Sequence, residues 1–298
     1  MNLGNFGMDT ITLAGPLEAK LRASKALGFS QIMLWAKDLA AYPDGLDSAV
    51  KLVRASGLRV TGLQVMRDYE GLSGPLHDYK IDIAKSMLRL CKAVGAPLLM
   101  VCSTTSKHAS GDPAHVARDL AKLATLAVPL GIRIGYEALS WGLHVNEYPA
   151  SWEVVEMADH SNLGVVIDSF HILANDTPLD SISDIPGNKI ALVQLSDYMW
   201  RDIHSPQERL ETARHLRVFP GEGTHSHELS DLLRRIDRCG YRGDYSFEVF
   251  NDDYLQMPPE VVAARAHQSA KWVTDQVLRR SLQARERPRE DMAASIAL

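Results

Sequence analysis

Four oxygen-bearing side chains stand at the ends of four consecutive apolar runs in the second half of the sequence. They are Glu137 in RIGYE, Asp168 in LGVVID, Gln194 in IALVQL and Glu248 in YSFEV. Three carboxylates that meet at one point repel one another unless a cation lies between them. Mg²⁺ and Mn²⁺ prefer oxygen ligands, whereas zinc sites usually include imidazole or thiolate. The pattern therefore predicts one divalent metal ion, with Mg²⁺ or Mn²⁺ favoured and Co²⁺ also compatible.

Each of these residues, taken alone, has a simpler interpretation. A single Glu after a strand is more often a loop residue or an ion-pair partner than a metal ligand. Four such residues at successive strand ends favour a shared site instead. Their apolar neighbours, as in VVID and SFEV, would make an unpaired charge costly to bury.

Two histidines follow predicted metal ligands closely in the sequence. His171 comes three residues after Asp168, and His144 follows Glu137 in the segment WGLHVN. Imidazole titrates near neutral pH, so either ring could act as a general acid or base. A lone histidine is usually structural, but the link to the ligands favours His144 and His171 as catalytic residues.

Two arginines complete the candidate pocket. Arg67 follows the third apolar run in QVMRDYEG, and Arg217 precedes VFPGEG in the connection 196–224. Arginine binds carboxylate or phosphate through paired donors, although a plain surface role is equally common. The sequence thus offers Arg67 and Arg217 as substrate-binding residues, and the long connection suggests a lid or a pocket wall.

These residues must be positioned by elements that alternate regularly along the chain. Eight short apolar runs rich in β-branched residues are separated by segments with helical spacing, which is typical of β-α units and a parallel sheet. The runs are MDTITL from Met8, QIMLW from Gln31, RVTGLQV from Arg59, PLLMVC from Pro97, RIGYE from Arg133, LGVVID from Leu163, IALVQL from Ile190 and YSFEV from Tyr245. Such strands end at a common barrel mouth, where the active sites of barrels lie.

The number of repeated units favours an α/β fold of the single (β/α)8 TIM-barrel type. Eight units in about 270 residues match this fold. A doubly wound sheet is the alternative, but the first run is followed by TLAGPLEAK, without the glycine-rich phosphate loop of a dinucleotide fold. We expect a catalytic barrel over 1–280, with its last helix at 259–280, and a charged, flexible tail at 281–298.

Composition excludes several other classes of protein. The 298 residues are 46% hydrophobic and 23% charged, which is enough apolar material for a large core. No stretch approaches the ~20 apolar residues of a membrane span, so no membrane partner is expected. The net charge of −5 argues against nucleic acid. The scattered Cys91, Cys102 and Cys239 indicate free thiols and, without a signal peptide, a cytoplasmic location.

Over about residues 8–271, the sequence resembles the xylose-isomerase-like barrel superfamily. The resemblance rests on Glu137, Asp168 with His171, a ligand on strand seven, and Glu248. The segments EALSWGLHVNEY, ADHSNLGVVIDSFHIL, QLSDY and RVFPGEG are similar to bacterial 3-dehydroshikimate dehydratases. That family has glutamine on strand seven, as Gln194 is here, whereas ketose epimerases generally have histidine. The histidine-rich zinc cluster of the endonuclease IV branch is missing.

The resemblance implies a metal-dependent lyase. Glu137, Asp168, Gln194 and Glu248 would hold the ion, and a small carboxylate, 3-dehydroshikimate, would be dehydrated to protocatechuate through a metal-stabilised enolate. His144 would be the leading candidate for the base, with His171 assisting. The implied setting is quinate and shikimate catabolism, within aromatic-compound metabolism. One departure is Trp35 followed by AKDL, where the family pattern has an acidic residue.

Two other functions stay open at the level of sequence. A sugar or inosose isomerase, epimerase or dehydratase could use the same metal site on the same barrel. A non-catalytic barrel that binds a small ligand is the second alternative, and an intact ligand set argues against it. The dioxygenase-like C-terminal domain of some relatives is not matched, and self-association is left open, since members of this superfamily often form oligomers.

Overall fold

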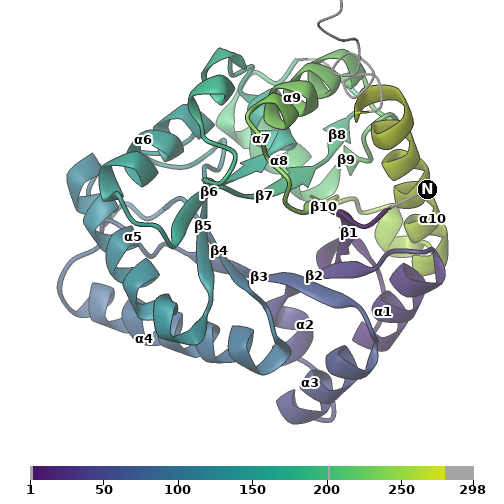
Figure 1. The fold of residues 1–298 in the computed structure, drawn as a ribbon, viewed down its shortest axis with the longest axis horizontal. Coiled ribbons are helices and arrows are strands. Elements are labelled where there is room, and N and C mark those ends of the chain that lie inside the picture. Colours follow the sequence, from purple (N-terminus) through teal and green to yellow (C-terminus); the bar gives the residue numbers. More distant parts are fainter. Residues whose placement is uncertain (1–2, 201, 279–298) are drawn as a thin grey trace, which may run out of the picture.

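The computed structural model describes residues 3–200 and 202–278 and contains a closed barrel of parallel strands (Figure 1). The strand order around the barrel is β1-β10-β7-β6-β5-β4-β3-β2. The strands are β1 (Phe6–Asp9), β2 (Gln31–Trp35), β3 (Arg59–Arg67), β4 (Leu98–Cys102), β5 (Arg133–Glu137), β6 (Leu163–Asp168), β7 (Ile190–Leu195) and β10 (Tyr245–Phe247). The predicted fold class is confirmed, and each strand overlaps one of the eight apolar runs, although β1 shares only Met8 and Asp9 with the predicted run MDTITL.

Helices surround this barrel on the outside (Figure 1). The helices of eight or more residues are α1 (Leu17–Ala26), α3 (Leu46–Ala55), α4 (Gly74–Val94), α5 (Pro113–Ala127), α6 (Tyr148–Ala158), α8 (Pro206–His215), α9 (Ser226–Arg238) and α10 (Pro259–Trp272). The shorter elements are α2 (Ala36–Ala40), α7 (Ser169–Ala174), η1 (Thr10–Thr12), η2 (Val128–Leu130), η3 (Asp180–Asp184), η4 (Tyr254–Gln256) and η5 (Val273–Leu278).

Local sequence explains where several of these helices end. Gly95 takes the left-handed conformation with φ 77° directly after α4, and Gly131 does so with φ 67° after η2. A residue with a Cβ atom is strained in that conformation, so glycine is favoured there. Each glycine turns the chain back toward the next strand, as the sequence pattern predicted.

Apolar side chains fill both sides of the strands. The larger core lies between the strands and the surrounding helices. A smaller cluster includes Leu98, Met100, Val166 and Leu192, on neighbouring strands of the sheet, and extends to Cys102 and Leu139 beside the strand ends. Because apolar side chains occupy both sides of the strands, the polar side chains of a functional site are expected at the ends of the barrel. Among the described residues, no helix combines the length and the hydropathy needed to cross a membrane.

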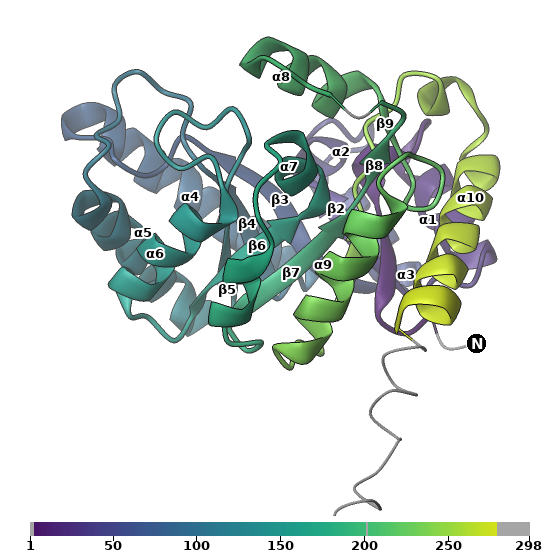
Figure 2. The ribbon, with the colours of Figure 1, turned by 90° about the horizontal axis from the view of Figure 1, so that it is seen from above.

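The connection between β7 and β10 adds elements that a simple barrel lacks. It contains β8 (Asp197–Tyr198), which pairs antiparallel with β9 (Arg217–Val218), and between them α8 lies over one end of the barrel (Figure 2). The expected pocket wall is therefore a helix. The helix predicted at 259–280 is confirmed up to residue 278 as α10 followed by η5, and residues 279–280 lie outside the described residues. The expected tail at 281–298 lies outside the described residues.

Candidate active site

Strand register brings the four predicted ligands to the same end of the barrel. Asp168 on β6 pairs with Gln194 on β7. Gln194 in turn pairs with Ser246, two residues before Glu248. Because alternate residues of a strand face the same side, Glu248 shares a face with Gln194. Glu137, at the end of β5, pairs with Cys102 at the end of β4.

A cavity of about 370 Å³ opens at this end of the barrel, and we call it the mouth cavity. Glu137 and Glu248 line it, together with His171, Arg217 and Gln64. All of the predicted ligands are at least nine-tenths buried. The expectation that polar residues at the ends of the strands share one site thus identified residues that lie close together.

The donor atoms at the mouth fit a metal ion. Glu137, Asp168 and His171 each offer a ligand atom, and these atoms lie within 4.8 Å of one another. Oε1 of Glu137 and both polar side-chain atoms of Gln194 are buried without a hydrogen-bond partner among the described residues. Leaving such atoms unpaired costs about 1–3 kcal/mol each. A bound cation would satisfy the oxygen atoms among them.

Arg217 brings positive charge into direct contact with these carboxylates. Its Nη1 atom lies 2.9 Å from Oδ2 of Asp168 and 3.1 Å from Oε2 of Glu248. Its Nε atom donates to the carbonyl of Ala213 at 2.9 Å. The guanidinium also packs on the ring of Phe170, 4.4 Å from the centroid. Arg217 therefore holds two predicted ligands in place, and its Nη2 atom forms no hydrogen bond with the other described residues.

The clustered carboxyl groups have perturbed acidity. Burial raises the pKa of Glu137 well above its usual value, and the charges of Glu248 and Asp168 raise it further. Burial also raises the pKa of Glu248, although the charge of Arg217 opposes the shift. Repulsion of this kind is what a divalent cation would relieve.

His171 lies directly beside the predicted ligands. Its Nε2 atom is 3.5 Å from Oδ2 of Asp168. Burial lowers the pKa of His171 to about 3, with Arg217 lowering it further and Asp168 opposing the shift. The backbone N–H of Ser140 donates to Nδ1 at 3.1 Å, so this nitrogen carries no proton. The neutral ring therefore carries its proton on Nε2.

The structure does not bring His144 to the mouth cavity. Its ring is exposed, and Nε2 lies 3.1 Å from the carbonyl of Ala109. The cause is a tight turn at Gly142, where a Cβ atom would lie 2.3 Å from the carbonyl of Val145. This turn directs the ring outward onto Gly111. Closeness in sequence to Glu137 was therefore a poor guide to position.

Two arginines line the rim of the mouth cavity. Arg67, from the end of β3, was expected there, and Arg214 of α8 joins it. Both side chains are exposed, and neither forms an ion pair within the described residues. Arg214 was missed in the sequence because nothing showed which face of α8 meets the barrel.

Two further polar residues near the site also escaped the sequence analysis. Asp9 ends β1, and its Oδ2 atom accepts a hydrogen bond of 2.6 Å from Nε2 of Gln64. Cys102 ends β4, and its thiol lies 2.9 Å from Oε2 of Glu137. Cys102 ends the predicted run PLLMVC, so the same reasoning from strand ends could have found it, whereas Asp9 is the second residue of the predicted run MDTITL and could not have been found in this way.

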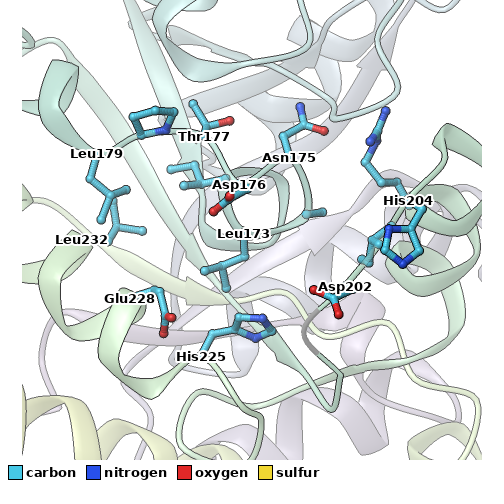
Figure 3. A pocket seen from close by; sticks show the side chains of 15 residues that line it. Leu173, Asn175, Asp176, Thr177, Leu179, Asp202, His204, His225, Glu228 and Leu232 are labelled. Carbon is cyan, nitrogen blue, oxygen red and sulfur yellow. The ribbon is translucent and has the colours of Figure 1, made fainter.

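A second cavity of about 650 Å³ lies outside the barrel mouth, between α7 and α9. Figure 3 shows the carboxylates of Asp176, Asp202 and Glu228 around it, with His225 at one side. Nδ1 of His225 lies 2.7 Å from Oδ1 of the buried Asp197. Among the described residues, the side chains grouped closely enough to share a metal ion are Glu137, Asp168 and His171, which lie at the mouth cavity. The mouth cavity is therefore the better candidate for the active site.

Comparison with known proteins supports the class defined by this fold and site. The model of the xylose isomerase-like TIM barrel family matches residues 21–275. The chain belongs to this family. A solved structure described as a xylose isomerase-like TIM barrel/4-hydroxyphenylpyruvate dioxygenase fusion protein superposes with a TM-score of 0.87 at 35% identity. The superposition covers 94% of this chain and 44% of that one.

Two curated relatives point to a particular group within the family. A 3-dehydroshikimate dehydratase of Pseudomonas aeruginosa is 38% identical over 251 residues, which is 84% of this chain and 38% of the relative. One of Pseudomonas putida is 36% identical over 269 residues, which is 90% of this chain and 41% of the relative. The chain thus spans about two fifths of the length of these two curated relatives.

Proposed function

We propose that this chain dehydrates 3-dehydroshikimate to protocatechuate with the help of a bound divalent metal ion. The observation that carries the proposal is the set of buried oxygen donors at the barrel mouth, with unpaired atoms on Glu137 and Gln194. The similarity to two 3-dehydroshikimate dehydratases supports the choice of reaction. The similarity covers nearly the whole barrel of this chain, so the matched segment of each relative is the one to compare with it.

Glu137, Asp168, Gln194 and Glu248 would hold the ion, which we propose to be Mg²⁺ or Mn²⁺. When bound, a divalent ion supplies Lewis-acid stabilisation of negative charge on a ketone oxygen. The ring of His171 lies close enough to Glu137 and Asp168 to be considered as a ligand as well. Because Nε2 carries its proton in this structure, we assign His171 the role of a hydrogen-bond donor at the edge of the site.

The substrate carboxylate requires a positive partner away from the buried acids. Arg67 and Arg214 meet this requirement, because both line the cavity and neither forms an ion pair with a carboxylate of the described residues. Arg217 is engaged with Asp168 and Glu248, and its Nη2 atom is left for a substrate oxygen. This division places the carboxylate at the rim and the ketone toward the metal ligands. The free cysteines also support a cytoplasmic location.

The proposal is tested by product formation from 3-dehydroshikimate. Metal-loaded protein is expected to form protocatechuate, identified by its aromatic ultraviolet absorbance and its proton spectrum. The polyol ketone scyllo-inosose, in a parallel sample, is expected to remain unchanged. Turnover of the inosose with no aromatic product from 3-dehydroshikimate would replace the dehydratase by a polyol enzyme on the same barrel. No turnover of either substrate by metal-replete protein would contradict both.

A further inference from the structure

A second histidine lines the mouth cavity and is held by a carboxylate. His215 is the last residue of α8, and its Nδ1 atom lies 3.1 Å from each carboxylate oxygen of Asp252. Its Nε2 atom has no hydrogen-bond partner among the described residues. A carboxylate on one ring nitrogen fixes the tautomer and leaves the other nitrogen as a proton acceptor.

The same backbone pairing that positions Arg217 also builds this histidine–aspartate pair. The segment 215–217 runs antiparallel to 250–252, with a bridge between Leu216 and Asn251. At one end, the N–H of Asp252 donates to the carbonyl of His215 at 3.0 Å. At the other end, the N–H of Arg217 donates to the carbonyl of Phe250 at 2.9 Å. Arg217 is thus fixed by the same two segments that place His215 at the cavity.

The other two candidate imidazoles are unsuited to accept a proton from a bound substrate. Nδ1 of His171 already accepts the N–H of Ser140, and its Nε2 atom carries the proton. His144 lies outside the mouth cavity, with its ring against Ala109 and Gly111. The described lining of the cavity then leaves one imidazole with a lone pair available, that of His215.

We infer that His215, oriented by Asp252, is the general base that removes the proton beside the substrate ketone. The inference rests on the proposed function and assigns a residue to its first step. The carbon–hydrogen bond beside the ketone breaks, the proton goes to Nε2 of His215, and the electron pair moves toward the ketone oxygen. Asp252 is the counter-ion of the imidazolium that forms.

The remaining steps restore the base and release water. The electron pair returns to form a ring double bond as the β carbon–oxygen bond breaks, and the leaving hydroxide takes the proton from His215 to become water. A ring carbon then loses a second proton to the ketone oxygen, which makes the ring aromatic. The net change is the loss of one water, so no oxidant or reductant is needed.

Chemical rescue provides the sharpest test, because the side chain of His215 is 41% exposed and a small base can reach its place. His215→Ala should lower kcat by about 10²- to 10⁴-fold. Added imidazole should restore a measurable part of that loss. Asp252→Asn should lower kcat less, since the imidazole remains. Metal binding by the stripped protein, followed by calorimetry, should be unchanged in both variants.

His204→Ala is the matched control, since His204 lies in the same connection but lines the second cavity (Figure 3). It should keep wild-type kcat and show no response to imidazole. Activity of His215→Ala within about twofold of wild type would overturn the assignment. So would a loss that imidazole does not restore, because that result indicates a structural role. Wild-type turnover tests the proposed function separately, and the variants are compared on whichever ketone the wild type converts.

Discussion

Buried polar atoms without partners are the feature of single residues that most directly indicates a ligand at the mouth. Gln194 has no exposed surface, and neither of its side-chain polar atoms is hydrogen-bonded within the described residues. Folded proteins rarely leave such atoms unpaired. Arg217 compensates part of the carboxylate charge through Asp168 and Glu248, but it does not reach Oε1 of Glu137. The site is therefore incomplete as protein alone.

The substitution Gln194→Leu separates the stability cost of burying this unpaired amide from its role as a metal ligand. In the presence of EDTA, the variant should be more stable than wild type by about 1–3 kcal/mol, because an unpaired buried amide is removed. Added Mn²⁺ should stabilise the wild type and have much less effect on the variant. Urea unfolding with and without metal measures both quantities. A variant that is less stable in EDTA, or that Mn²⁺ stabilises equally, would contradict this account.

Arg214→Ala tests how the rim recognises the substrate. Loss of a charge-assisted contact should raise KM for 3-dehydroshikimate roughly 10- to 100-fold, with a smaller change in kcat. Binding of protocatechuate should weaken similarly, whereas binding of catechol, which lacks the carboxylate, should not. Trp35 and Trp141 line the cavity, so their fluorescence can report both titrations. Arg89→Ala, at an exposed position of α4, is the control. Equal weakening of protocatechuate and catechol binding by Arg214→Ala would exclude a contact between Arg214 and the carboxylate.

At the scale of elements, the sequence was sufficient for the strands and for the ligands at their ends. Apolar β-branched runs and helix-ending glycines identify β-α units, and the closing of a barrel brings strand ends together. The pairing of 215–217 with 250–252 could not be predicted, because it joins two connections separated by a helix and a strand. The position of the His144 ring could not be predicted for a related reason. The turn at Gly142 that directs this ring outward is packed against Ser103, which follows a different strand.

The loop after β3 is tied to its neighbours by a buried acid, Glu70. Its Oε1 atom accepts hydrogen bonds from the N–H of Thr104 at 2.6 Å and from the hydroxyl of Tyr136 at 3.0 Å. Burial raises the pKa of Glu70 to about 7 from an ordinary value of 4.5. Because the folded state binds the proton more tightly, the contribution of Glu70 to stability falls as pH rises from 4.5 to 7.

Glu70→Gln should therefore gain stability relative to wild type as pH rises through this window. The gain should reach an order of 2–3 kcal/mol above pH 7 and be small near pH 4.5. Urea unfolding of both proteins at pH 5 and pH 8 measures the difference. Glu153→Gln, on the exposed face of α6, should show no such trend. A difference that is the same at both pH values would contradict the protonation of Glu70 in the folded state.

At the scale of the whole molecule, the barrel concentrates acidic groups at one end of a chain whose net charge is only −5. The apolar clusters on the two faces of the sheet exclude ionised groups, so the carboxylates gather where the strands end. The connection carrying α8 then covers that end and contributes Arg214, His215 and Arg217 (Figure 2). The sequence predicted the acids of the barrel and Arg217 of this connection, but it did not predict that Arg214 and His215 would line the cavity.

The most direct test of the central claim is a titration of metal-stripped protein with Mn²⁺ or Mg²⁺ in the presence of 3-dehydroshikimate. Bound metal and the rate of protocatechuate formation are followed in the same samples. We expect the rate to rise in proportion to bound metal and to level off at one ion per chain. Glu248→Gln should bind the ion weakly and remain inactive. Full activity after metal removal, or a metal-replete and active Glu248→Gln protein, would contradict the claim that these carboxylates hold the ion used in dehydration.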